Sequence, residues 1–217
     1  MGGAINRIHS TWPESQNDVA QTDNADDRRK LDKFLMKTPC RPDETILKQL
    51  VAEYKRSEFR SRALKEMEAF RKLLSLEVAI LDAVKLSPIN GKKHDHQWRI
   101  PKDILDDAQE KLLAAKQAIK AAKDFEALHA IVEARIGPIP GVGDLVIYDI
   151  AHRIGAFLRL EPKRVYLHRG TAEGARLLGF LGPTVDPKDL PEPLSQLTAA
   201  EIEDFLCIYK SRLKKNL

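Results

Sequence analysis

The sequence contains few of the residues that mark secreted, metal-binding or membrane-spanning proteins. Its two cysteines, Cys40 and Cys207, lie far apart in a chain of 217 residues. This spacing indicates neither a disulfide framework nor a zinc site, and it predicts a protein of the reducing cytoplasm. The N-terminal segment lacks the apolar core of a signal peptide, and no apolar run approaches the roughly 20 residues needed to span a bilayer. We therefore expect no membrane partner.

The sequence also has little excess of positive over negative charge. Lys and Arg total 36 against 32 Asp and Glu, which gives a net charge of +4. The basic residues are dispersed and form no run, so a basic surface can arise only through folding. This composition excludes a histone-like basic tail.

The helix signals predict an all-α fold in three parts. Residues 1–24 are polar and predict a disordered tail, because they offer little apolar surface to bury. Residues 25–122 predict a long helical hairpin, and residues 123–217 predict a compact C-terminal domain of several helices. No strand pair and no internal repeat is indicated. In the first arm of the hairpin one buried stripe is predicted from apolar residues at helical spacing: Ala63, Met67, Phe70, Leu74, Leu81 and Val84.

The second arm begins near Pro101 and carries a heptad-like seam. Large residues and alanine alternate at steps of three and four in Leu105, Ala108, Leu112, Ala115 and Ile119. Such a pattern lets helix axes approach closely. We expect the seam to form the core of an intramolecular hairpin. The alternative is a homodimer joined through the same seam, in which the chain serves as a protein-interaction scaffold.

Capping signals divide the C-terminal part into helices. An apolar helix is predicted from about residue 144 to residue 160. Thr171 is predicted as the N-cap of a short helix that stops at Gly179. Thr198 and Glu201 have the spacing of a capping box for the final helix.

A glycine-rich turn joins two of these helices. It reads Ile139-Pro140-Gly141-Val142-Gly143 and lies between helical segments within residues 131–160. This order resembles the helix-hairpin-helix family, in which a hydrophobic residue, Pro, Gly, a hydrophobic residue and Gly separate two short helices. Members of that family bind the sugar-phosphate backbone of DNA or RNA without reading the bases. Parts of the C-terminal third are also similar to uncharacterised bacterial proteins, a similarity that implies no function.

The resemblance implies sequence-nonspecific binding of the backbone of nucleic acid, of DNA more than RNA. We expect an accessory or non-enzymatic protein rather than an enzyme. Glycine permits positive φ and lets phosphate oxygens reach main-chain amides, while the following helix start adds N–H donors and a positive dipole end. His168 and Arg169 precede a second predicted helix start. The residues predicted to bind nucleic acid are Gly141, Val142, Gly143, Arg153, Lys163, Arg164, His168, Arg169 and Thr171. No catalytic residue, metal or cofactor is predicted.

Two residues depart from the family pattern. Asp144 directly follows the second glycine, where its charge opposes a phosphate, and Ile147 replaces the usual alanine. A turn that only caps two helices explains the same glycines. An i, i+4 ion pair with Asp149 is an alternative role for Arg153.

A weaker alternative is a divergent DNA-processing enzyme with Asp149, Tyr166 and His168 in its pocket. The DNA glycosylases of the family carry a catalytic aspartate after the hairpin, and some carry a lysine just behind it. Here Tyr166 and Leu145 occupy those places, so repair chemistry is not supported. The loop His94–His96 offers two imidazoles without a third ligand, which favours a polar loop over a metal site.

Overall fold

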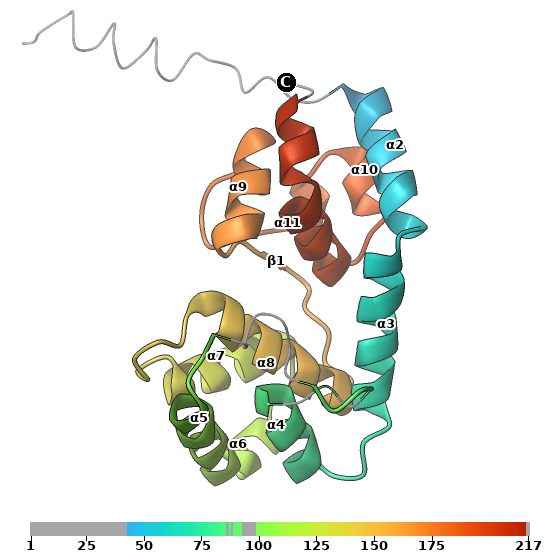
Figure 1. The fold of residues 1–217 in the computed structure, drawn as a ribbon. Helices are drawn as coiled ribbons and strands as arrows, with labels where there is room; N and C mark the ends of the chain where they lie inside the picture. The colour runs from blue at the N-terminus through green and yellow to red at the C-terminus, as the bar shows by residue number, and fades with distance from the viewer. Residues whose placement is uncertain (1–42, 86, 88, 93–98, 216–217) are drawn as a thin grey trace, which may run out of the picture. The chain divides into compact units, whose positions relative to one another are not determined.

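The computed structural model describes residues 43–85, 87, 89–92 and 99–215 (Figure 1). All of them belong to one unit of the chain, Pro39–Leu217. The predicted tail at residues 1–24, Cys40 and the loop at residues 94–96 lie outside the described residues. Within the described part, no helix is long and apolar enough to cross a membrane.

The described residues form ten α-helices, two strands of two residues each and one short 3₁₀ helix, which confirms the all-α class. The helices are α2 (Glu44–Lys55), α3 (Glu58–Arg71), α4 (Leu76–Lys85), α5 (Lys102–Ala114), α6 (Lys116–Lys120), α7 (Phe125–Ile136), α8 (Asp144–Leu158), α9 (Arg169–Leu177), α10 (Glu192–Ser195) and α11 (Ala199–Lys215). The strands are β1 (Val165–Tyr166) and β2 (Thr184–Val185), and the 3₁₀ helix is η2 (Pro187–Asp189).

Serine caps break the first arm of the predicted hairpin into α2, α3 and α4. The Ser57 hydroxyl accepts from the Arg60 amide over 3.2 Å at the start of α3, and Ser75 accepts from the Val78 amide over 3.3 Å at the start of α4. Serine favours such positions because its oxygen satisfies an amide that has no partner within the helix. Leu74 falls between α3 and α4 and is 97% exposed, and Leu81 of α4 is 37% exposed. The prediction that these two leucines belong to a buried stripe was therefore wrong.

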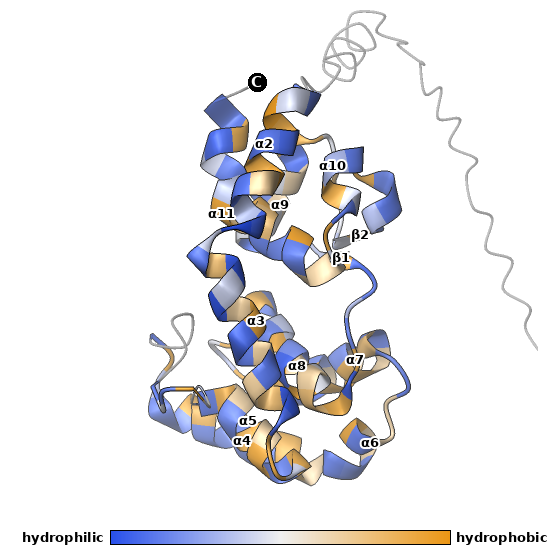
Figure 2. Ribbon diagram, turned by 90° about the vertical axis from the view of Figure 1, so that its right-hand side faces the viewer, coloured by the Kyte–Doolittle hydropathy of each residue, from blue (hydrophilic) through white to orange (hydrophobic). Residues whose placement is uncertain are grey.

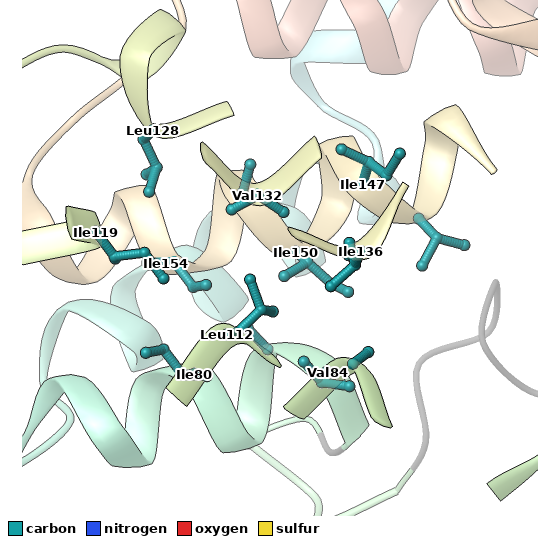
Figure 3. Packing of buried hydrophobic residues seen from close by; sticks show 14 of the residues in the cluster. Ile80, Val84, Leu112, Ile119, Leu128, Val132, Ile136, Ile147, Ile150 and Ile154 are labelled. Atoms are coloured by element: carbon teal, nitrogen blue, oxygen red, sulfur yellow. The ribbon is translucent and has the colours of Figure 1, made fainter. Parts of the chain in front are cut away.

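Helices α4 to α8 enclose a first hydrophobic core, in which α8 packs against α3, α4 and α7. Figure 3 shows aliphatic side chains from all five helices of this core pointing toward one another. The five residues of the predicted seam lie inside it and are at most 5% exposed. The intramolecular core therefore accounts for the seam, and in this structure those side chains are not available to a second copy of the chain.

A second hydrophobic core joins α2 to the C-terminal helices α9, α10 and α11. Tyr54 of α2 meets Phe205 of α11 edge to face, with ring centroids 5.9 Å apart. In Figure 2, blue and orange residues alternate in bands along α2 and α11, as expected of helices with one buried face. The two cores thus do not divide at residue 122, because α2 shares its core with residues 165–213.

The structure contains the predicted capping box near the C-terminus and also a pair of short strands that was not predicted. The capping box at α11 is formed: the Thr198 amide donates to Glu201 Oε2 over 2.9 Å and the Glu201 amide donates to Thr198 Oγ1 over 3.3 Å. No strand was predicted, yet β1 and β2 pair antiparallel, with Val165 opposite Val185. Two residues per strand are too few to show an alternating apolar pattern.

Candidate functional site

The turn between α7 and α8 has the geometry that its residue types require. The Val142 amide donates to the Ile139 carbonyl over 3.1 Å, which closes a four-residue turn. Pro140 occupies its second position and Gly141, with φ +92°, its third. A type II turn needs positive φ at the third position, which favours glycine. The turn is thus fixed by its own residues and by the packing of α7 on α8.

Both glycines of this turn are accessible to solvent. Gly141 and Gly143 lie at the surface, while Val142 is half-buried. Gly143 is the N-cap of the 15-residue helix α8 and provides no side-chain cap. Within the described residues, neither glycine amide donates to another group of the protein. A Cβ at Gly143 would have no neighbour within 4 Å, so the space in front of this residue is open.

The surface beside the turn also carries acidic side chains. Asp144 is exposed in the first turn of α8. Burial lowers the pKa of His129, and the carboxylates of Glu133 and Asp144 act in the opposite direction, which places both acids within electrostatic reach of this imidazole. A phosphate at the turn would therefore meet favourable amides and an unfavourable carboxylate.

Three of the predicted basic residues lie on the surface. Lys163, Arg164 and Arg169 are exposed, and the Arg164 Nε donates to Thr184 Oγ1 over 2.9 Å. These three side chains remain available as candidates for contact with phosphate.

Arg153 occupies a different environment from the predicted one. It is 6% exposed, and its guanidinium lies 3.3 Å from Glu66 Oε1 and 3.6 Å from Asp149 Oδ2. It also donates to the Ala83 carbonyl over 3.4 Å. The predicted pair with Asp149 is confirmed, and the expectation that Arg153 contacts phosphate is corrected. A buried guanidinium held by two carboxylates cannot leave them without a large free-energy cost.

His168 and Thr171 are also internal. Helix α9 begins at Arg169 with His168 as its N-cap, so the prediction of Thr171 as the N-cap was wrong. Thr171 is fully buried and its hydroxyl donates to Glu203 Oε1 over 2.6 Å, while His168 Nε2 lies 3.4 Å from the same oxygen. This correction removes His168 and Thr171 from the predicted surface for phosphate.

A group of acids that was not predicted from the sequence lies where α3, α8 and α11 meet. Glu66, Asp149, Glu203 and Asp204 line one cavity of about 170 Å³ together with Arg153. A signal for Glu203 exists in the sequence, because it lies three residues before Leu206 and so shares the apolar face of α11.

Burial changes the protonation of this acidic group. It raises the pKa of Glu203 well above the ordinary range, and Asp204 acts in the same direction. Burial, with Asp149 next in effect, raises the pKa of Asp204 to about 7. Burial lowers the pKa of His152 to about 4, so this imidazole is neutral at pH 7. Groups with shifted pKa values in a cavity are characteristic of binding or catalytic sites.

Two further cavities adjoin this region. One of about 270 Å³ is lined by residues of α3, α8 and α11, and one of about 300 Å³ is lined by Tyr148, Tyr166 and His168 among others. Asp149, Tyr166 and His168, the residues of the enzyme alternative, do not line one cavity. Asp149 lines the acidic cavity, while Tyr166 and His168 line the cavity of about 300 Å³. Among the described residues, no group of three or more His, Cys, Asp or Glu is arranged to hold a metal ion.

Comparisons with models of protein families, with curated proteins and with solved structures found no match for this chain.

Proposed function

We propose that the chain binds the sugar-phosphate backbone of nucleic acid, with DNA as the preferred form, through the turn between α7 and α8. The observation that carries the proposal is that Gly141 and Gly143, just before α8, are exposed and that neither amide donates to another described group of the protein. Main-chain amides at a helix start bind anions because they present N–H donors and the positive end of the helix dipole. The resemblance of residues 139–143 to the helix-hairpin-helix turn supports phosphate as that anion.

Fewer residues can contact phosphate than the sequence predicted, because some of them are paired inside the protein. Arg153, His168 and Thr171 are held by buried carboxylates, so the positive charges come from Lys163, Arg164 and Arg169. Asp144 weakens the interaction, because its exposed carboxylate follows the second glycine. Such a site reads no bases, and it binds different DNA sequences with similar affinity.

A salt titration tests this proposal. Fluorescence anisotropy of labelled duplex DNA, single-stranded DNA and RNA gives the affinity of each at several salt concentrations. Three phosphate contacts predict a slope of about −2.7 for log affinity against log salt on duplex DNA, or about a 40-fold loss between about 50 and 200 mM salt. Replacing Lys163 by Gln should reduce the slope by about one unit. Absence of binding at the lowest salt, or an affinity that salt does not change, would overturn the proposal.

A further inference from the structure

The cavity of about 270 Å³ and the acidic cavity of about 170 Å³ lie next to each other and share part of their lining. Both are lined by Ala63 and Met67 of α3, His152 of α8, and Ala200 and Asp204 of α11. Asp204 therefore lines both. We call the cavity of about 270 Å³ the outer chamber and the acidic cavity of about 170 Å³ the inner chamber.

The outer chamber has mainly apolar walls, and each of the two arginines that line it is paired with a carboxylate. Leu64, Ala156 and Leu160 contribute to these walls. Arg60 Nε lies 2.7 Å from Glu201 Oε1, and Arg71 is equally close to Glu161 through its Nη2. An apolar ligand body fits such walls, since they contain mainly hydrocarbon surface.

The inner chamber contains more hydrogen-bond acceptors than donors. Four carboxyl groups line it, while Arg153 is its one guanidinium. Asp149 Oδ2 is buried and receives no hydrogen bond within the described part of the chain, because the Arg153 Nη2 is 3.6 Å away. A buried acceptor without a donor costs free energy, and a ligand that brings N–H groups removes that cost.

Neutral hydroxyl groups donate to two of the other acids. The Tyr54 hydroxyl donates to Asp204 Oδ2 over a long 3.4 Å, and Thr171 donates to Oε1 of Glu203. His152 is neutral at pH 7 and so adds no positive charge. The chamber therefore presents a negative potential to whatever enters it.

We propose that the two chambers together bind a small organic ammonium ion. The ammonium group lies between the carboxylates of Asp204 and Asp149, and the apolar body of the ligand lies against Leu64, Ala156 and Leu160. An ammonium supplies three N–H donors and one positive charge, which are what the inner chamber lacks. A carboxylate or phosphate ligand is excluded by repulsion. The site is separate from the turn at residues 139–143 and does not depend on nucleic-acid binding.

Binding is coupled to the ionisation of Asp204. Its carboxyl interacts with Tyr54 from α2, Glu66 from α3, Asp149 from α8, and Glu201 and Glu203 from α11. Arg60 and His152 line the same cavities as Asp204. The pKa of Asp204 is about 7 in the free protein, chiefly through burial and then through Asp149. A cation beside Asp204 lowers this pKa, so binding near pH 7 releases a proton to the buffer. Affinity for an amine therefore increases as the pH rises from 6 to 8.

Isothermal titration calorimetry with phenethylamine, and with 2-phenylethanol as its neutral isostere, tests the proposal on the full chain. We expect the amine to bind at least about tenfold more tightly than the alcohol at pH 8, as for a charge-assisted hydrogen bond. In Asp204→Asn the ratio should fall to about twofold, and in Asp107→Asn, a control at an exposed pair with Lys111, it should stay unchanged. Titrations in buffers of different ionisation enthalpy should show proton release at pH 7.

Two results would overturn the proposal. One is equal affinity of the amine and the alcohol in the unaltered protein, which includes the case in which neither binds. The other is an amine preference that persists in folded Asp204→Asn and Asp149→Asn, since binding would then occur elsewhere. Circular dichroism checks folding, and both substitutions keep the side-chain size while they remove a charge from an acidic group.

Discussion

The Thr171 hydroxyl donates to Glu203 Oε1 over 2.6 Å, and both side chains are buried between α9 and α11. Burial raises the pKa of Glu203, so this acid depends on its hydrogen bond for compensation. We expect Thr171→Val, which keeps the shape and removes the hydroxyl, to lower the free energy of unfolding by about 1–3 kcal/mol. Thr171→Ser, which keeps the hydroxyl, should cost less. Urea denaturation measures both, and an unchanged free energy of unfolding in Thr171→Val would show that the hydrogen bond contributes nothing.

The raised pKa of Asp204 predicts how stability depends on pH. An acid whose pKa rises on folding takes up protons as the chain folds, so its contribution to stability falls as the pH rises from about 4 to about 7. Asp204→Asn removes this contribution. Relative to the unaltered protein, the variant should gain about 2 kcal/mol between pH 5 and pH 7.

Denaturation at both pH values measures this difference. His152 has the opposite pH dependence, because its lowered pKa makes folding less favourable in acid. The His152 effect is present in both proteins and largely cancels in the comparison. A stability difference that stays constant from pH 5 to pH 7 would mean that Asp204 ionises as it does in the unfolded chain.

The close approach of α9 to α11 makes Gly174 sensitive to a single methyl group. A Cβ at this position would lie 2.3 Å from the Leu206 carbonyl oxygen, which is backbone and cannot move without shifting the helix. Gly174→Ala should therefore destabilise the chain by about 3 kcal/mol or more. At Gly170 the added Cβ meets the Cys207 side chain at 2.7 Å, which can rotate. Thermal unfolding should show a clearly smaller loss for Gly170→Ala than for Gly174→Ala, and the reverse order would contradict the packing.

A substitution at Asp144 should increase the affinity for DNA. Its carboxylate is exposed in the first turn of α8, next to the proposed phosphate position. Asp144→Asn removes one repulsive charge and should strengthen DNA binding about three- to tenfold at low salt, with the gain shrinking as salt screens the charge. An exposed acid elsewhere supplies the control, Asp107→Asn. If both variants bind DNA as the unaltered protein does, the phosphate does not lie near Asp144.

Features encoded by neighbouring residues were predictable from the sequence. The turn at Pro140 and Gly141, the apolar helix that follows it, and the capping box of Thr198 and Glu201 each depend on residues within a few positions of one another. The burial of the seam residues in α5 and α6 could also be predicted, because their spacing alone indicates one buried helix face.

The positions of charged groups could not be predicted in the same way. Arg153 is buried because Glu66, 87 residues earlier in the chain, lies beside it. Thr171 looks like a helix cap by residue type, but helix α9 starts two residues earlier and turns its hydroxyl toward Glu203. Pairings between distant residues leave no periodic trace, so the acidic cavity emerged only from the folded structure.

Gly143 offers the sharpest test of whether the amides of the α7–α8 turn bind a phosphate. A Cβ there has no neighbour within 4 Å and φ is −112°, so both Gly143→Ala and Gly143→Asp should fold. Asp is the better N-cap, so Gly143→Asp should have the higher melting temperature of the two. We expect Gly143→Ala to keep DNA affinity within about threefold and Gly143→Asp to lower it by about tenfold or more at low salt. Equal DNA affinity of the two folded variants would contradict the account.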